Sequence, residues 1–252
     1  MLLTIDIGNT RLKLGLFSDD DLIKKQGIPL QSIDSIEKCK GMLLDFLGVN
    51  KDIEGACICS VVPDAAKIVI SAINRITENP CILVTSETKT GLDLSALKNP
   101  QTLGSDRLAS AAWAFHNYRK PICIVDFGTA TTISVISGLG IFMGGAILPG
   151  INTMRESLSI NTASLPLVEL NEPISLPANN TATAIISGII IGTVGGVERI
   201  ISEIESEIKQ KLMILVTGGN VVFTTPYLKI KHVIEQDISL NGLQVIYKLN
   251  ND

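Results

Sequence analysis

Apolar and polar positions in the first half of the chain form runs with the periods of strands and helices. Residues 2–7 and 12–17 are short apolar runs on either side of a Gly-Asn turn, a pattern that predicts a β-hairpin. The other elements expected here are strands at 56–62 and 81–84 and helices at 36–47, 65–76 and 107–117. This alternation predicts a mixed α/β fold.

Near residue 120 the pattern begins again. The elements expected in this half are strands at 122–127 and 131–136 around a Gly-Thr turn, a helix over 181–208, and a strand over 212–216. Gly195 and Gly196 predict a break in the long helix, because glycine disfavours helix interiors.

The two halves share a motif. Asp6 and Asp126 lie 120 positions apart, each two residues before a glycine, and the segments around them align without a gap. We interpret this match as an internal duplication, with one lobe at residues 1–118 and a second at 119–252. A chain of 252 residues with 46% hydrophobic content is large enough to build two such cores.

Composition narrows the possible partners. The net charge is −4, and lysines and arginines do not gather into a basic stripe, so a nucleic-acid partner is not expected and a small molecule is favoured. The most apolar segment, 184–197, is shorter than the roughly 20 residues that cross a bilayer. No basic leader precedes the apolar residues after Met1. We therefore expect a cytoplasmic protein without membrane insertion.

The five cysteines are odd in number, and three of them lie within apolar runs that resemble strands. They are Cys39, Cys57, Cys59, Cys81 and Cys123. We interpret them as reduced, small hydrophobic residues rather than as a disulfide framework. No second pair matches the spacing of Cys57 and Cys59, so a structural zinc site is not predicted.

Each Asp-x-Gly turn has the residues that a phosphate-binding turn needs. Glycine lets the backbone approach a phosphate, the Asn or Thr that follows can donate hydrogen bonds, and the carboxylate can hold a bridging cation. One such turn is common in ordinary hairpins. Two turns in the same strand-turn-strand context, at Asp6 and Asp126, indicate a triphosphate held by one turn from each lobe.

A third glycine-rich segment follows the strand at 212–216. Thr217, Gly218, Gly219 and Asn220 would let an adenine or ribose lie against the backbone, although an ordinary Gly-Gly loop explains them equally well. The order of the three segments is typical of the actin, Hsp70 and sugar-kinase superfamily. This order predicts two ribonuclease-H-like lobes, with mixed sheets flanked by helices.

Asp106 and Arg107 stand at the start of the alanine-rich helix between the two turns. Such a pair is usually a helix cap and a solvated charge. In a kinase that phosphorylates an alcohol, however, a carboxylate can accept the hydroxyl proton and a guanidinium can anchor an acidic substrate. We favour the second interpretation.

At this point the sequence resembles a known family, the type III pantothenate kinases. The resemblance extends over nearly the whole chain, and its most specific elements are Gly-Ser-Asp-Arg and Gly-Gly-Ala-Ile-Leu-Pro-Gly. The matching segments are 6–13, 60–63, 104–107, 126–132, 144–150, 180–181 and 187–188.

The resemblance implies phosphorylation of the pantothenate 4′-hydroxyl by ATP, the first step towards coenzyme A, with Asp106 as general base. The implied ATP-binding residues are Asp6, Ile7, Gly8, Asn9, Thr10, Arg11, Leu12, Lys13 and, from the second lobe, Thr129. The implied pantothenate-binding residues are Gly104, Ser105, Asp106, Arg107 and Thr181. Asp6 would hold Mg²⁺, and Asp126 would lie at a site for a monovalent cation, K⁺ or NH₄⁺. The family also implies a homodimer, with the glycines of 188–196 packed closely.

The sequence departs from the family pattern at Ser134, where aspartate is usual, and at Leu97 and Ala178. These departures concern substrate affinity more than the type of reaction. Two other functions stay open: a non-catalytic relative that binds nucleotide or pantothenate as a regulatory protein, and an enzyme acting on another small alcohol. Asp6, Asp106 and Arg107 favour the pantothenate kinase.

Overall fold

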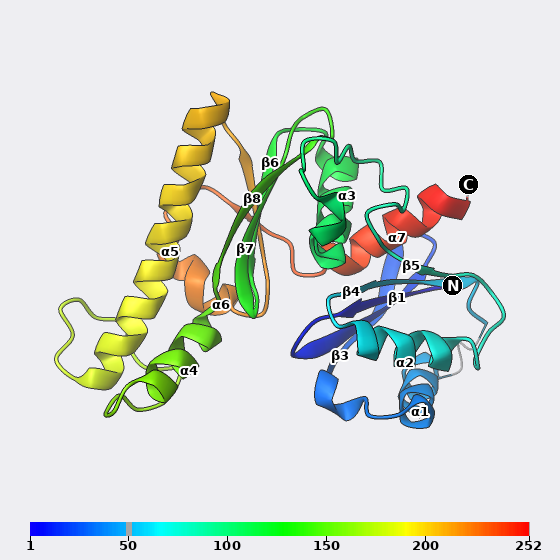
Figure 1. The fold of residues 1–252 in the computed structure, drawn as a ribbon, viewed down its shortest axis with the longest axis horizontal. Coiled ribbons are helices and arrows are strands. Elements are labelled where there is room, and N and C mark those ends of the chain that lie inside the picture. Colours follow the sequence, from blue (N-terminus) through cyan, green and yellow to red (C-terminus); the bar gives the residue numbers. More distant parts are fainter. Residues whose placement is uncertain (49–51, 252) are drawn as a thin grey trace. The chain divides into compact units, whose positions relative to one another are not determined.

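The computed structural model describes residues 1–48 and 52–251 (Figure 1). These residues form two compact units, each with its own five-stranded sheet. The first unit contains Met1–Arg119, Gly140–Phe142 and the C-terminal segment that begins at Asp237. The second contains Lys120–Leu139 and Met143–Gln236.

The sheet of the first unit has the strand order β3-β2-β1-β4-β5. Its strands are β1 (Leu2–Ile7), β2 (Arg11–Ser18), β3 (Asp21–Pro29), β4 (Gly55–Ser60) and β5 (Cys81–Leu83). β1 pairs antiparallel with β2, which confirms the predicted hairpin, and parallel with β4. β3 has no alternating apolar pattern because most of its residues are exposed, so the sequence analysis missed it.

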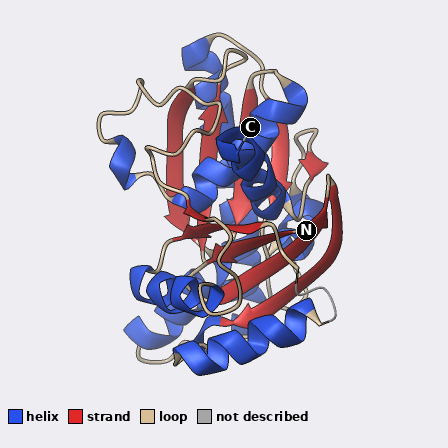
Figure 2. Cartoon of the chain, turned by 90° about the vertical axis from the view of Figure 1, so that its right-hand side faces the viewer, coloured by secondary structure: helices blue, strands red, loops and turns tan. Residues whose placement is uncertain are grey.

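Both faces of β1 are buried, and helices cover each of them (Figure 2). Leu3, Ile5 and Ile7 point into a core shared with α1 (Ile36–Leu47) and α2 (Pro63–Ile73). Because side chains alternate along a strand, the residues between them face the opposite side. That side carries a second core, to which the helices α3 (Ser105–Tyr118) and α7 (Ile238–Asn251) contribute.

α7 corrects the predicted lobe boundaries. The predicted second lobe, residues 119–252, includes this helix, but the segment from Asp237 belongs to the first unit. Its apolar residues Leu240, Leu243 and Ile246 are buried against α3, β1 and β4. These buried contacts place α7 in the first unit, although it comes last in the sequence.

The sheet of the second unit repeats the order of the first, as β8-β7-β6-β9-β10. Its strands are β6 (Ile122–Phe127), β7 (Ala130–Ile136), β8 (Phe142–Pro149), β9 (Met213–Thr217) and β10 (Val233–Ile234). β6 pairs antiparallel with β7 and parallel with β9, as β1 does with β2 and β4. The repeated order agrees with an internal duplication and confirms the predicted α/β class with two mixed sheets.

The long helix α5 (Thr181–Ile208) runs without interruption, so the break predicted at Gly195 and Gly196 is wrong. Burial of Val194, Val197 and Ile201 against the second sheet offsets the low helix propensity of the two glycines. By length and hydropathy alone this helix could cross a membrane, but half of its most apolar stretch is buried, as in a core helix.

Short elements complete the chain. They are α4 (Ile151–Asn161), α6 (Val221–Thr224) and the 3₁₀ turns Leu30–Ser32, Pro100–Thr102 and Thr225–Tyr227. Each of the five cysteines is a free thiol, and four of them are buried. They serve as small core residues, as the sequence analysis expected.

The contact between α7 and α3 yields a prediction about stability. A methyl group on Gly242 would overlap the backbone of Ala109, so Gly242→Ala should push the two helices apart and cost about 1–3 kcal/mol of unfolding free energy. Denaturant unfolding measures this cost. Gly41→Ala on α1 is the matched control, because a methyl group there meets nothing within 4 Å. It should leave stability unchanged or raise it by up to about 1 kcal/mol. Equal effects of the two substitutions would contradict the close helix contact.

Candidate active site

Asp6 lies at the end of β1 with a neighbour on each adjacent strand. In the strand register Asp6 is opposite Lys13 on β2 and Cys59 on β4. Residues directly opposite in neighbouring strands share one face of the sheet. The pairing of the three strands therefore gathers a carboxylate, an ammonium group and a thiol on the face covered by α3 and α7.

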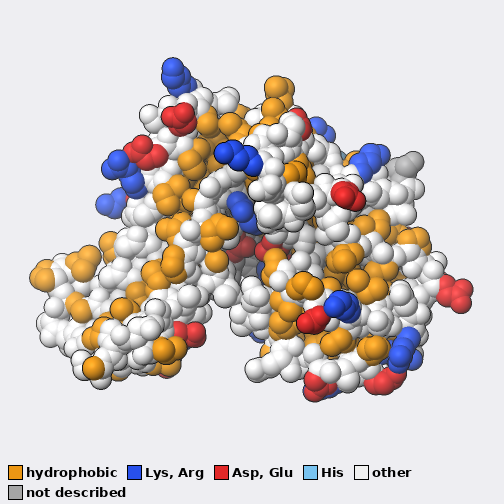
Figure 3. Space-filling model, viewed as in Figure 1, with side chains coloured by type: hydrophobic (Ala, Val, Ile, Leu, Met, Phe, Trp, Pro, Cys, Tyr) orange, Lys and Arg blue, Asp and Glu red, His pale blue; other side chains and the backbone are white. Residues whose placement is uncertain are grey.

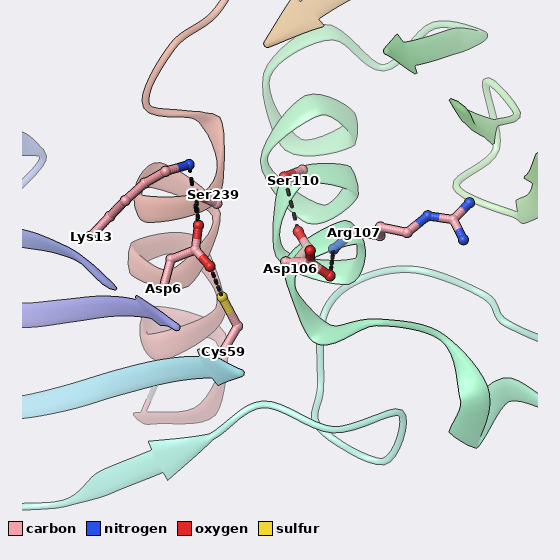
Figure 4. Close-up of polar contacts among 7 residues, drawn as sticks. All are labelled: Asp6, Lys13, Cys59, Asp106, Arg107, Ser110 and Ser239. Atoms are coloured by element: carbon pink, nitrogen blue, oxygen red, sulfur yellow. Dashed lines mark hydrogen bonds and ion pairs between the residues drawn. The ribbon is translucent and has the colours of Figure 1, made fainter. Parts of the chain in front are cut away.

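Both carboxylate oxygens of Asp6 accept hydrogen bonds (Figure 4). The Cys59 thiol donates to Oδ1 at 3.5 Å, and the Ser239 hydroxyl of α7 donates to Oδ2 at 2.8 Å. The Lys13 ammonium is 3.4 Å from Oδ2. Burial raises the pKa of the Cys59 thiol well above its usual value, and the nearby Asp6 and Asp106 carboxylates raise it further. The thiol therefore stays protonated and acts as a donor.

Asp106 is fixed at the first turn of α3 by its neighbours. Its Oδ1 accepts a hydrogen bond from the backbone N–H of Arg107 at 2.8 Å. Gly104 leaves room for that carboxylate, since a Cβ there would lie 2.5 Å from Oδ1. The Ser105 hydroxyl bridges to the end of β4, accepting from the backbone N–H of Ser60 at 2.8 Å and donating to its carbonyl oxygen at 3.0 Å. The start of the helix is thereby joined to the strand next to Asp6.

The pKa of the Asp106 carboxyl is raised from its ordinary value. Burial is the largest cause, because it disfavours the charged form, and the negative charge of Asp6 is the second. The backbone N–H and the guanidinium of Arg107 act in the opposite direction without overcoming these two. A raised carboxyl pKa beside a second carboxylate is typical of a catalytic base.

The Arg107 side chain extends away from the Asp106 carboxylate (Figure 4). Its guanidinium carbon lies 5.7 Å from the centre of the Phe142 ring, within the range of a cation–π contact. Burial lowers the pKa of this guanidinium from its ordinary value, which still leaves it charged at neutral pH. The group is held in place as a cation that can receive an acidic ligand.

The first Asp-x-Gly turn begins at Asp6. The backbone N–H of Gly8 donates to the Arg11 carbonyl oxygen at 3.0 Å and closes the turn. A surface pocket of about 580 Å³ lies beside it, lined by Asn9, Thr10, Arg11, Pro29, Leu30 and Gln31. Ile7 and Leu12, two of the residues proposed to bind ATP, point into the core. Only their backbone atoms are available to a ligand.

The second Asp-x-Gly turn, in the second unit, is one residue shorter and is closed by a hydrogen bond from the backbone N–H of Gly128 to the Ala130 carbonyl oxygen at 3.1 Å. Asp126 ends β6 and is opposite Thr132 on β7 and Thr217 on β9. A side chain on Gly218 would overlap the Asp126 carboxylate, and Gly218 also has a φ of +106°. Glycine is required there for both reasons. The Gly-Gly segment therefore packs directly against the second turn.

Thr129 of the second turn contacts the start of α4. Its carbonyl oxygen accepts a hydrogen bond from the Thr153 hydroxyl at 2.9 Å. A side chain on Gly150 would overlap the same carbonyl group. The Pro-Gly that ends the motif at 144–150 thus lets α4 approach the turn. Ser134, where the family pattern has aspartate, is buried on β7 opposite Ile124.

Thr181 begins α5 and is exposed, while Asn180 caps the helix by accepting from the Thr183 backbone N–H at 2.9 Å. Both residues line a surface pocket of about 520 Å³. The other lining residues are Leu165, Ala178, Asn179, Ala184 and Ile185. This pocket belongs to the second unit, whereas Asp6 and 104–107 belong to the first.

The carboxylates of the first unit suit a metal that arrives with a nucleotide. Among residues 1–48 and 52–251, no group of three His, Cys, Asp or Glu side chains could hold a metal by itself. Mg²⁺ in phosphate-binding sites usually takes one or two carboxylates, with phosphate and water oxygens as its other ligands. The Asp6 carboxylate fits that donor set.

The surface carries no basic stripe on the face shown in Figure 3, where lysine and arginine side chains are scattered among acidic ones. Several exposed basic side chains pair with acidic ones, for example Lys67 with Asp64 at 3.0 Å and Arg199 with Glu203 at 2.7 Å. Small polar ligands remain the better match for this charge distribution.

Two residues of the site were not identified from the sequence. Cys59 was interpreted only as a small hydrophobic residue, and Ser239 was not considered at all. The predicted strands at 2–7 and 56–62 contained the signal for Cys59, because pairing the two strands in parallel places it opposite Asp6. Ser239 is 233 residues from Asp6 in the chain, and no local pattern indicates their contact.

The sequence is similar to that of known proteins. The family model described as type III pantothenate kinase matches residues 2–203. A type III pantothenate kinase of Brevibacillus brevis is 34% identical, over 99% of this chain and 99% of its own. That of Moorella thermoacetica is 32% identical, over 99% of this chain and 100% of its own.

Solved structures share the fold at lower identity. A protein of Campylobacter jejuni, described as belonging to the Baf family of transcriptional activators, has a TM-score of 0.62 at 22% identity, with 98% of each chain covered. A glucokinase from an Antarctic psychrotroph has a TM-score of 0.53 at 11% identity, covering 100% of this chain and 99% of its own. These two show the architecture alone. By the family model and the curated relatives, the chain belongs to the type III pantothenate kinase family.

Proposed function

We propose that this protein phosphorylates pantothenate with ATP, the first step of coenzyme A biosynthesis, and that Asp106 is the general base. The observation that carries this assignment is the Asp106 carboxylate itself. It lies at the start of α3, partly buried, and its pKa is raised by burial and by Asp6. Family membership indicates pantothenate as the substrate, and the Asp106 carboxylate is a group that can accept the proton of its hydroxyl.

In the proposed mechanism Asp106 accepts the proton of the pantothenate 4′-hydroxyl as that oxygen attacks the γ-phosphoryl group. The raised pKa makes Asp106 a better proton acceptor than an exposed carboxylate. Arg107 binds the carboxylate of pantothenate and so orients the hydroxyl. A divalent ion, proposed as Mg²⁺ at Asp6, neutralises phosphate charge when ATP is bound.

The remaining assignments follow the two turns. Residues 6–13 bind the ATP phosphates, with Thr129 contributing from the second turn, and the pocket beside Asn9 and Thr10 supports a ligand there. Gly104 and Thr181 contribute to the pantothenate site. Because the Ser105 hydroxyl both accepts from the Ser60 backbone N–H and donates to the Ser60 carbonyl oxygen, we assign this residue to positioning the loop. Asp126 holds the monovalent cation, K⁺ or NH₄⁺.

We also propose a cytoplasmic homodimer. A methyl group on Gly188, Gly192 or Gly195 of α5 would meet no other atom within 4 Å among the described residues. The packing of this chain therefore does not require those glycines, and close approach of a second copy would give them a role. The non-catalytic alternative is not favoured, since the curated relatives are named as kinases and Asp6, Asp106 and Arg107 are present.

Replacing the proposed base tests the mechanism. Asp106→Asn keeps the shape and an oxygen that can accept from the Arg107 N–H, but it cannot take up a proton. We expect kcat to fall by about a hundredfold or more in an ADP-release assay, with nucleotide binding retained. Asp64→Asn is the matched control, because Asp64 also stands in the first turn of a helix but is exposed. Unchanged turnover in Asp106→Asn would eliminate Asp106 as the base.

The raised pKa of Asp106 predicts the acid side of the pH profile. The base must be deprotonated, so kcat/KM should decline as pH falls through its pKa in the free enzyme. Because burial and Asp6 raise that pKa above its ordinary 3.8, the decline should begin at higher pH than for an exposed aspartate. Steady-state rates between pH 4 and pH 8 (roughly the range in which a perturbed carboxyl titrates) measure it. A rate that increases on acidification would contradict the assignment.

The Arg107 guanidinium predicts a substrate-specific loss. Arg107→Lys keeps the charge but loses the planar pair of donors, so the KM for pantothenate should increase about tenfold while that for ATP stays the same. The alcohol analogue of pantothenate, which has no carboxylate, should react equally with both proteins. Arg119→Lys is the matched control, because Arg119 ends the same helix and lies 4.4 Å from the centre of the Phe115 ring. An equal increase in KM for the alcohol would exclude the proposed ion pair.

A further inference from the structure

α7 connects the elements that carry the two carboxylates. It packs against α3, which begins with Ser105 and Asp106, and against β1, which ends after Asp6. Gly242 brings its backbone close to that of Ala109 on α3. Within the first unit, α7 therefore contacts both α3, which carries Asp106, and β1, which carries Asp6. The family model ends at residue 203, so α7 lies outside the matched segment.

The first turn of α7 holds the Asp6 carboxylate directly. Ser239 is the second residue of the helix, its side chain is buried, and its hydroxyl donates to Asp6 Oδ2 at 2.8 Å. A carboxylate at the first turn of a helix is also stabilised by the free N–H groups and the dipole of that turn. Lys13, the charged partner on the same oxygen, is 43% exposed and at 3.4 Å, so solvent weakens its hold. The buried hydroxyl is the better-defined contact.

Other contacts fix the helix in place, so the position of Ser239 is well determined. Asp237, just before the helix, pairs with Lys25 of β3 at 2.7 Å. Gln244 donates to the Asp20 carboxylate at 2.7 Å, and the Tyr247 hydroxyl donates to the Glu54 carbonyl oxygen at 2.8 Å. These bonds attach α7 to three parts of the first unit, and none of them involves Asp6.

From these contacts we propose that Ser239 is a positioning residue for nucleotide binding. Its hydroxyl fixes the orientation of the Asp6 carboxylate so that the other lone pairs of that carboxylate could ligate the divalent ion that accompanies ATP. Cys59 fixes Oδ1 in the same way from the opposite side, but a thiol is the weaker donor. This role rests on the proposed function of Asp6 as a nucleotide ligand. It does not require that pantothenate be the acceptor.

Calorimetric titration of the full-length protein with ATP and Mg²⁺, without pantothenate, tests the role. Ser239→Ala removes the hydroxyl, and we expect the dissociation constant of ATP with Mg²⁺ to increase about tenfold. In steady-state assays the KM for ATP should increase by a similar factor, whereas the KM for pantothenate should stay the same. Ser239→Thr keeps the hydroxyl and should restore wild-type binding.

Gln244→Ala is the matched control. Gln244 is buried on the same helix and makes hydrogen bonds of similar length, but it does not contact Asp6. Its replacement should lower the melting temperature about as much as Ser239→Ala and leave ATP binding unchanged. If Ser239→Ala does not fold, Ser239→Cys retains the size of the side chain with a weaker donor and should weaken ATP binding by an intermediate factor.

Three outcomes would overturn the role of Ser239: unaltered ATP binding in Ser239→Ala, or in Ser239→Cys where that variant is used; an equal loss in Gln244→Ala; or failure of Ser239→Thr to restore binding. Failure of the proposed function gives a different result. In that case the wild-type protein would bind ATP with Mg²⁺ but would not phosphorylate pantothenate, and the titration would still decide the role of Ser239.

Discussion

Two carboxylates lie close together in a partly buried space of the first unit, and the surrounding structure serves to keep them there. Burial raises the pKa of Asp106, and the negative charge of Asp6 raises it further. If the two carboxylates were on flexible loops, they would move apart and the repulsion between them would decrease. Instead Asp6 ends a strand that is buried on both faces, and Asp106 begins a helix that is joined to the next strand through Ser105. The surrounding fold therefore holds the two carboxylates together despite their repulsion.

The duplicated strand order places an aspartate at the same position in each of the two sheets. In each unit the next-to-last residue of the central strand is an aspartate, opposite residues on an antiparallel and a parallel neighbour. The two ends differ in their surroundings. Asp6 accepts hydrogen bonds from a thiol and a hydroxyl, whereas Asp126 lies against the glycine turn at Gly218. The same strand order thus places the two carboxylates in different surroundings, and we propose different ions for them.

Local patterns in the sequence predicted most of the elements but not all of their partners. The hairpin around Gly8 and Asn9 and the helix at 36–47 follow from the spacing of their apolar residues. β3 was missed because it is exposed, and the expected break in α5 does not occur because tertiary packing outweighs the propensity of glycine. For the site, both Asp-x-Gly turns and 104–107 could be found as motifs. Ser239 could not, since only the three-dimensional fold brings the last helix to Asp6.

We propose that this pair of carboxylates serves a pantothenate kinase. The most direct test is ADP release by the purified protein with Mg²⁺ and K⁺, compared among pantothenate, simple sugars and glycerol as acceptors. We expect turnover that depends on pantothenate and yields its 4′-phosphate. ADP release that is equally fast without pantothenate, or that requires one of the other alcohols, would contradict it.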